Sequence, residues 1–201
     1  MVAVEGSSRL PSRKLGASWK VNAPGNAELK RLAALHNLED HLFEVVTPRF
    51  QENRTLSPYD FFAIVTWKSN RAKTRIRDGL AAAGKPASIL MREVSEAASA
   101  EAKVETLLKV RGIGLPMASA ILTVCYPEEF TVLDYRAWGT LEEASIEGLP
   151  ARYPQEVGEY LQYCRICQHL AAEKVLSLRD LDRALWAKSW EDDLLALAEG
   201  A

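Results

Sequence analysis

Signals that begin and end α-helices recur along almost the whole chain, and they limit its fold more than any other feature. Ser57-Pro58 offers a hydroxyl at an N-cap and a proline at the first helical position. Gly84, followed by Lys85-Pro86, is typical of a helix end. Between such signals, apolar residues recur every three or four positions, as on one face of a helix. Only residues 130–133 resemble a strand, and four residues make no sheet, so the sequence predicts an all-α fold.

We expect a loose arm over residues 1–25, where Ser, Gly and Pro occur without periodicity. Asn26 is predicted to cap the first helix, which ends before Pro48. Ser177 with Asp180 three residues later resembles a capping box. The other predicted helices begin at Pro58, run from about Arg71 to Gly84 and over 86–98, follow Ser99, begin at Pro116, and lie near 154–173, 178–187 and 190–199.

The composition is that of an ordinary soluble protein, with 48% hydrophobic and 26% charged residues among 201. No stretch approaches the ~18 apolar residues that span a membrane. The first 16 residues lack the apolar core of a signal peptide. Three cysteines are too few, and odd in number, for a disulfide framework. We therefore expect a cytoplasmic protein that does not interact with membranes. We also expect a monomer, a prediction that does not rest on the composition.

Net charge does not indicate a polyanion as partner, because 25 basic residues face 27 acidic ones. The distribution is more informative. Residues 1–31 hold six basic and two acidic residues, whereas residues 139–201 hold six basic and twelve acidic ones. In the neutral middle, five basic residues fall within 68–77 with no acid among them. A polyanion would therefore be bound locally.

Two glycines around one apolar residue join two predicted helices at Gly112-Ile113-Gly114. Glycine permits backbone angles closed to other residues and leaves the amides uncovered, and Ile113 can fill the space between the helices. Such a hairpin directs free amides and the positive end of the second helix at one spot, which suits a phosphate. A plain turn between two helices with a glycine C-cap is the alternative. The glycine pattern in its apolar frame favours DNA binding.

Asp134 lies twenty residues after Gly114, behind a loop that contains Pro127, and opens a new helix. This order resembles the helix–hairpin–helix–Gly/Pro–Asp superfamily of base-excision DNA glycosylases, with the spacing of its endonuclease III-like branch. The resemblance is strict over residues 104–138 and weaker from Ser57 on. It implies a two-lobed helical fold. One lobe would contain 26–56 and 146–201, and the other 57–145, ending in the helix–hairpin–helix motif (about 100–126) and Asp134.

The resemblance also implies that Asp134 is catalytic. Breaking an N-glycosidic bond develops positive charge on the sugar, which a fixed carboxylate can stabilise, or the carboxylate can orient a water. A simple helix N-cap is the alternative role, and the two roles are compatible.

Departures from the family narrow the expected reaction. Members that also cut the strand carry a lysine two residues after the second hairpin glycine, where this chain has Pro116, and neither Lys103 nor Lys109 takes its place. The loop before Asp134 has no glycine, and the four-cysteine iron–sulfur pattern is absent. We therefore expect hydrolytic base release without lyase activity, with no cluster and no required cofactor. Family members often bind a structural monovalent cation through hairpin carbonyls, here those of Leu108, Val110 and Ile113.

Residues expected to touch DNA fall in two groups. The hairpin group comprises Arg111, Gly112, Ile113 and Gly114, and the second group comprises Trp67, Lys68 and Arg71. By resemblance, Lys68 takes the place of a wedge inserted into the stack, and Trp67 could stack on a base. The alternatives are a core tryptophan and a solvated basic face. Trp138 and Tyr135 are candidates to line the base pocket. For Trp138, a place in the core is the alternative.

Cys164 and Cys167, with Cys125, could supply metal ligands, but their apolar helix favours small buried thiols. The segment from Arg179 to Trp186 alternates charges with an apolar stripe, which we interpret as packing.

Two functions follow. The first is a monofunctional DNA glycosylase acting on duplex DNA, and the second is a non-catalytic helix–hairpin–helix protein that only binds DNA. The Gly114-to-Asp134 spacing favours the first, because a binding hairpin alone does not need it. One sequence does not name the base, since a pocket is assembled only by folding.

Overall fold

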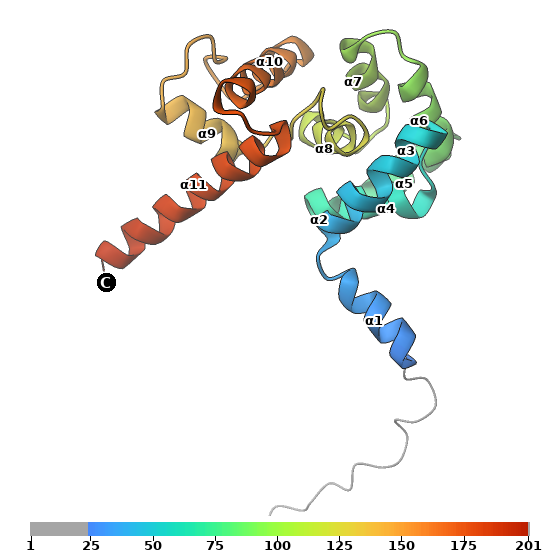
Figure 1. The fold of residues 1–201 in the computed structure, drawn as a ribbon. Helices are drawn as coiled ribbons and strands as arrows, with labels where there is room; N and C mark the ends of the chain where they lie inside the picture. The colour runs from blue at the N-terminus through green and yellow to red at the C-terminus, as the bar shows by residue number, and fades with distance from the viewer. Residues whose placement is uncertain (1–23, 201) are drawn as a thin grey trace, which may run out of the picture. The chain divides into compact units, whose positions relative to one another are not determined.

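The structure, a computed structural model, describes residues 24–200. It is built of helices joined by turns, with no strand among those residues, so the all-α prediction is confirmed. In chain order the elements are α1 (Asn26–Ala34), α2 (Leu38–His41), η2 (Leu42–Val46), α3 (Thr47–Asn53), α4 (Pro58–Ser69), η3 (Asn70–Ala72), α5 (Lys73–Ala82), α6 (Ala87–Glu96), α7 (Ala100–Leu108), α8 (Leu115–Cys125), α9 (Tyr135–Glu143), α10 (Val157–Lys174) and α11 (Leu178–Glu199) (Figure 1).

The chain divides into two compact units, Met1–His36 and Asn37–Ala201. Of the first unit, helix α1 is described, and it buries no residue. Its N-cap is Gly25, so Asn26 lies inside the helix rather than capping it. The arm expected over 1–25 lies almost wholly outside the described residues. The two-lobed division of the chain stays a prediction.

The core of the second unit surrounds α8. Every residue of this helix except Pro116 is buried. Helices α3, α4 and α7 pack against it. On the other part of the unit, α11 packs against both α9 and α10, and α10 also meets α7 (Figure 1). The small residues of α8, among them Ala118, Ser119 and Ala120, are fully buried, which allows neighbouring helices to approach closely.

Several local signals act as the sequence predicts. The hydroxyls of Ser57, Ser99 and Ser177 accept the amides of the residues three positions on, as N-caps do. Gly84, just after α5, has a φ of +61° and ends that helix in the left-handed conformation. Each of these signals works within one turn of chain, so it needs no partner from elsewhere.

The chain differs from the predicted helices in two places. The first predicted helix is broken after Ala34, and helical structure continues through Pro48 at the start of α3. Proline has no amide to donate and crowds the carbonyl four residues before it, and the turn before it widens into the π-helix η2. The second difference is α11, which is one helix of 22 residues instead of two.

No helix within residues 24–200 is both long and apolar enough to span a lipid bilayer.

Candidate active site

Asp134 is the N-cap of α9. Its backbone is extended, and its Oδ1 accepts the amide of Arg136 at 3.1 Å. The predicted capping role is therefore confirmed, and it uses only one carboxylate oxygen. The side chain of Asp134 is 23% exposed, so the second oxygen stays available to other groups.

The segment that leads to Asp134 is held from two helices. The Ser119 hydroxyl of α8 accepts the amide of Leu133 at 2.9 Å and donates to the carbonyl of Pro116 at 2.8 Å. From α10, the Tyr160 hydroxyl donates to the carbonyl of Thr131 at 3.0 Å. These bonds satisfy the backbone of a buried segment that belongs to no helix. They fix Asp134 relative to the end of the hairpin helix.

Lys68, in the last turn of α4, points at this carboxylate. Its Nζ donates to Oδ2 of Asp134 at 2.9 Å and to the carbonyl of Leu133 at 3.2 Å. The lysine side chain is only 15% exposed. The expected wedge residue therefore lies against the expected catalytic aspartate, although 66 positions separate the two in the chain.

A cavity of about 380 Å³ opens beside the pair. This volume falls in the range of small-molecule sites, roughly 300–1,000 Å³. Its walls come from α2, α4, α11 and the segment before α9, and its lining residues are Glu39, Trp67, Lys68, Val132, Asp134, Arg179, Asp182, Arg183 and Trp186. The lining is thus aromatic and largely charged.

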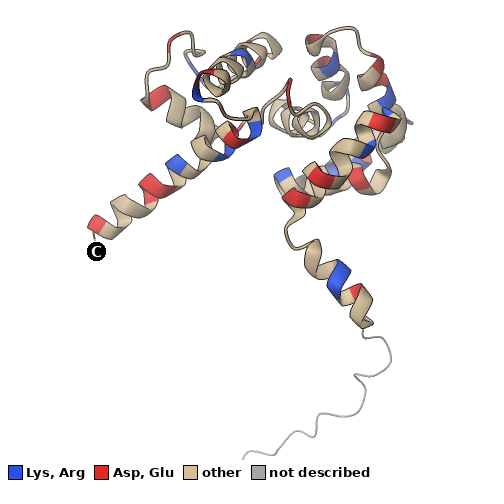
Figure 2. Cartoon of the chain, viewed as in Figure 1, with Lys and Arg blue, Asp and Glu red and all other residues tan. Residues whose placement is uncertain are grey.

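Another wall of the cavity contains an ion-pair network that joins α11 to α2. Arg179 Nη2 lies 2.6 Å from Oε1 of Glu39, and Arg183 Nε lies 2.7 Å from the same oxygen. Arg179 also pairs with Asp182, and its guanidinium lies 5.2 Å from the ring centroid of Trp67. Basic and acidic residues are interspersed along α11, as the blue and red bands of its ribbon show (Figure 2). The buried Nε of Arg179 has no hydrogen-bond partner among the described residues, which leaves a donor of this wall unused.

Burial and ion pairing shift the pKa values of three acidic groups here. It raises the pKa of Asp182 to about 6, although Arg179 and Lys68 act in the opposite direction. Burial also raises the pKa of Tyr153, whose hydroxyl donates to the carbonyl of Leu133, to about 12. At Glu39, burial is outweighed by the pairing with Arg179 and Arg183, and the pKa is lowered.

The predicted hairpin joins α7 to α8 through Gly112, Ile113 and Gly114, of which only Gly112 takes a left-handed backbone conformation. Gly112 has a φ of +101°, Ile113 is buried, and Gly114 is the N-cap of α8 without a side-chain cap. Arg111 is exposed beside it. The carbonyl of Val110 accepts a hydrogen bond from the amide of Ile113 at 3.0 Å, and this bond closes the turn. The cation expected on the carbonyls of Leu108, Val110 and Ile113 stays a prediction.

Gly79 of α5 supports the hairpin from outside, and the sequence did not indicate it. A Cβ atom at Gly79 would lie 1.9 Å from the carbonyl oxygen of Arg111. A Cβ at Gly112 would lie 3.1 Å from the carbonyl oxygen of Arg75. Helix α5 and the hairpin therefore touch backbone to backbone, and the basic residues of α5 lie next to the hairpin because of it.

Of the remaining predicted site residues, only one lines the cavity. Trp67 lines the cavity, and Arg71 is exposed in η3. Trp138 is buried and packs edge-to-face on Tyr153, with ring centroids 6.0 Å apart. Tyr135 is 66% exposed. Neither Trp138 nor Tyr135 is among the residues that line the cavity.

Six lining residues were not predicted as site residues: Glu39, Val132, Arg179, Asp182, Arg183 and Trp186, of which the last four belong to the segment interpreted from the sequence as packing. Four of them lie on α11 at intervals of three, one and three residues, so they share one helix face. That spacing was a usable signal, because polar residues on a face opposite an apolar stripe can line a site as well as meet solvent. Glu39 carried no such signal.

The three cysteines are buried and unpaired. Burial raises the pKa of the Cys164 thiol to about 11, and that of Cys167 is raised by the same cause. Within residues 24–200, no group of three or more His, Cys, Asp and Glu side chains is placed to hold a metal ion.

A scan against protein-family models, a search of curated proteins and a search of solved structures found no match. What the cavity does must therefore be inferred from its own residues.

Proposed function

We propose that this protein is a DNA glycosylase that hydrolyses the N-glycosidic bond of a damaged or modified base flipped out of duplex DNA. The observation that carries the proposal is the position of Asp134. The carboxylate that caps α9 lies at the edge of a cavity of about 380 Å³. The segment before it is hydrogen-bonded to Ser119 of α8, the helix that follows the hairpin. A flipped base would enter the cavity, and the carboxylate would face the sugar.

The chemistry assigned to Asp134 is charge stabilisation at C1′ and orientation of the attacking water. Such a role needs a carboxylate whose place is set before the substrate arrives. The hydrogen bonds from Ser119 and Tyr160 to the preceding segment meet that need. Trp67 and Trp186 offer aromatic surface to a base, and Arg179 offers an unused donor.

Phosphate binding is assigned to the hairpin. The uncapped N-terminus of α8 at Gly114 and the exposed guanidinium of Arg111 would hold one phosphate, without contact to a base. Arg71 and the basic side chains of α5 would extend this contact along the strand. A monovalent cation on the carbonyls of Leu108, Val110 and Ile113 would complete the hairpin.

The proposal is tested by a base-release assay. Duplexes carrying uracil, 8-oxoguanine, 3-methyladenine or hypoxanthine are incubated with the full chain, and the released base is measured directly. Release from one duplex, lost in Asp134→Asn while duplex binding is unchanged, supports the proposal. Asp60→Asn serves as the matched control, because Asp60 lies outside the cavity. Equal release by wild type and Asp134→Asn would remove Asp134 from the mechanism.

The second function, a DNA-binding module without catalysis, is favoured by the hairpin alone. It predicts steeply salt-dependent duplex binding that Arg111→Ala weakens, no base release from any duplex, and indifference to Asp134→Asn.

A further inference from the structure

Lys68 and Asp134 form an ion pair whose two members come from different elements. Lys68 follows Trp67 in the last turn of α4, and both residues line the cavity. Asp134 ends a segment that Ser119 of α8 holds, and α8 is the helix that follows the hairpin. Under the proposed function, on which this inference rests, the aromatic wall at Trp67 receives the flipped base and the carboxylate faces its sugar. The ammonium of Lys68 then lies on the side of the base.

The side-chain nitrogen of Lys68 is held as an ammonium by two acceptors. Nζ donates to Oδ2 of Asp134 at 2.9 Å and to the carbonyl of Leu133 at 3.2 Å. An ammonium has three hydrogens, so one hydrogen remains for a group inside the cavity. Only 15% of the lysine side chain and 23% of the aspartate side chain are exposed, so water screens these charges less than it would at an open surface.

Cleavage of an N-glycosidic bond separates charge in a defined direction. The bond between C1′ and the base nitrogen breaks with both electrons leaving on the base, so the sugar becomes positive and a neutral base becomes negative. Water then adds its oxygen to C1′ and gives up one proton, and the departed base takes up one proton, so one water is consumed. A carboxylate beside the sugar and an ammonium beside the base match this separation of charge before the substrate arrives.

The other cations of the cavity are paired with acids that take no part in this reaction. Arg179 pairs with Glu39 and Asp182, and Arg183 pairs with Glu39. Lys68 is the only lysine among the lining residues, and its partner is the carboxylate that faces the sugar. Lys68 is therefore the cation best placed to act on the departing base.

The charge of the base decides whether an ammonium at this place is of use. Uracil, hypoxanthine and 8-oxoguanine are neutral in DNA and leave as anions, which a hydrogen bond from an ammonium stabilises. A base alkylated on a ring nitrogen, such as 3-methyladenine or 7-methylguanine, is a cation in DNA and leaves as a neutral molecule. The ammonium would repel such a base and would stabilise no charge as it departs.

We infer that Lys68 is a catalytic residue that donates a hydrogen bond to the departing base, and that the substrate is a neutral base rather than one alkylated on a ring nitrogen. Lys68 contributes its charge and its third hydrogen. It forms no covalent bond to the substrate and keeps its proton throughout the reaction.

The test measures single-turnover base release by the full chain from duplexes that form two matched purine pairs. The neutral 8-oxoguanine is compared with the cationic 7-methylguanine, and the neutral hypoxanthine with the cationic 3-methyladenine. Uracil adds a neutral pyrimidine. We expect wild type to release at least one neutral base, and to leave the cationic bases at their rate of spontaneous loss.

Two variants separate the charge of Lys68 from the bulk of its side chain. Lys68→Met keeps an unbranched side chain without charge or donor, so release of the neutral base should fall about 10²–10³-fold, as on loss of one donor to a developing negative charge. Release of the cationic bases should stay unchanged or rise, because a repelling charge is gone. Lys68→Arg keeps a cation and a donor and should recover most of the rate lost in Lys68→Met.

Lys103→Met is the matched control. Lys103 forms a similar pair outside the cavity, where its Nζ lies 2.9 Å from Oε2 of Glu129 and its side chain is 14% exposed. Its replacement removes the same charge from an equally sheltered pair, so the rate per folded molecule and the preference for neutral bases should equal those of wild type. Thermal unfolding midpoints measured for all variants establish that each one folds.

Failure of the inference and failure of the proposed function give different results. Undiminished release of the neutral base by Lys68→Met, an equal loss in Lys103→Met, or a rate for Lys68→Arg no higher than that of Lys68→Met would overturn the role of Lys68. Release of cationic bases alone by wild type would overturn the substrate class. Each of these outcomes leaves the glycosylase in place, whereas no release from any duplex would overturn the proposed function and the inference together.

Discussion

Two aspartates near the start of a helix differ in what surrounds them. Asp60, in the first turn of α4, is 4% exposed, and its carboxylate accepts the Ser57 hydroxyl at 2.9 Å and lies 3.4 Å from Nη1 of Arg49. Asp134 is itself the N-cap of α9 and has a closer cation, and its side chain is 23% exposed and lines a cavity. A carboxylate at the start of a helix is therefore enclosed by the protein at one place and open to a cavity at the other.

Access to solvent and to a ligand makes the difference. The carboxylate of Asp60 is buried, so its hydrogen bonds can contribute to stability but not to the binding of a ligand. One oxygen of Asp134 is used in capping α9, and the other is shared with Lys68 at the cavity wall. This contrast predicts that mutation of Asp60 affects stability, whereas mutation of Asp134 affects the reaction.

The largest expected effect tests the contrast directly. Asp134→Asn should lower the rate of base release by about 10²–10⁴-fold, because the amide cannot stabilise a cation or accept a proton. Asp60→Asn should leave the rate per folded molecule unchanged. Single-turnover base release under saturating enzyme measures both. A similar loss in the two variants would show that access does not separate these aspartates.

A third aspartate sharpens the contrast through pH. The pKa of Asp182 is raised in the folded protein to about 6 from a usual 3.8, so its neutral form favours folding. The associated stability is complete below about pH 4 and is lost as the pH rises through about 6, by an amount on the order of 2–3 kcal/mol. Asp182→Asn stays neutral and removes this dependence.

Unfolding free energies of wild type and Asp182→Asn, compared at about pH 4.5 and about pH 7.5, measure the effect. The difference between the two proteins should shift in favour of the variant at the higher pH. A difference that is constant across this range would contradict the raised pKa.

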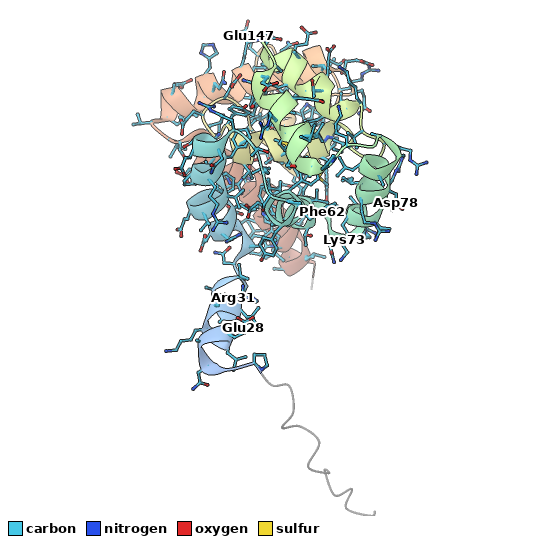
Figure 3. The ribbon with its side chains drawn as sticks, turned by 90° about the vertical axis from the view of Figure 1, so that its right-hand side faces the viewer. Glu28, Arg31, Phe62, Lys73, Asp78 and Glu147 are labelled. Carbon is cyan, nitrogen blue, oxygen red and sulfur yellow. The ribbon has the colours of Figure 1, made fainter. Side chains whose placement is uncertain are left out.

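Asp60→Ala should lower the free energy of unfolding by about 1–3 kcal/mol, because the Ser57 hydroxyl and Arg49 lose a buried partner. Asp78→Ala is the matched control. Asp78 is an exposed residue of α5 (Figure 3) paired with its neighbour Arg77, so its loss should change stability by less than about 0.5 kcal/mol. Denaturant unfolding measures both variants. Equal destabilisation of the two would contradict the structural role of Asp60.

The smallest expected effect concerns the support of Asp134. Ser119→Ala removes the acceptor of the Leu133 amide and should cost about 1 kcal/mol of stability. It should also slow base release several-fold while leaving duplex binding unchanged, because the carboxylate is then less firmly placed. Thr123→Ala is a suitable comparison, since the Thr123 hydroxyl bonds only within α8, to the carbonyl of Ser119. Slowing by both variants alike would indicate general loosening of α8.

The sequence by itself determined the features that act within a few residues. The caps at Ser57, Ser99 and Ser177, the stop at Gly84 and the extended N-cap at Asp134 all follow from side chains that bond to their own turn. The all-helical fold is the sum of such signals and of the apolar periodicity between them. These features were predictable because no distant partner is involved.

Tertiary structure alone decided which distant residues meet. Lys68 and Asp134 lie 66 positions apart, and the cavity wall joins Glu39 to Arg179 from opposite ends of the unit's sequence. Packing also decided that Trp138 belongs to the core. Spacing along a helix shows which side chains share a face, but only packing shows what that face meets. Asp134 and Lys68 were therefore both named from the sequence, whereas the contact between them was not.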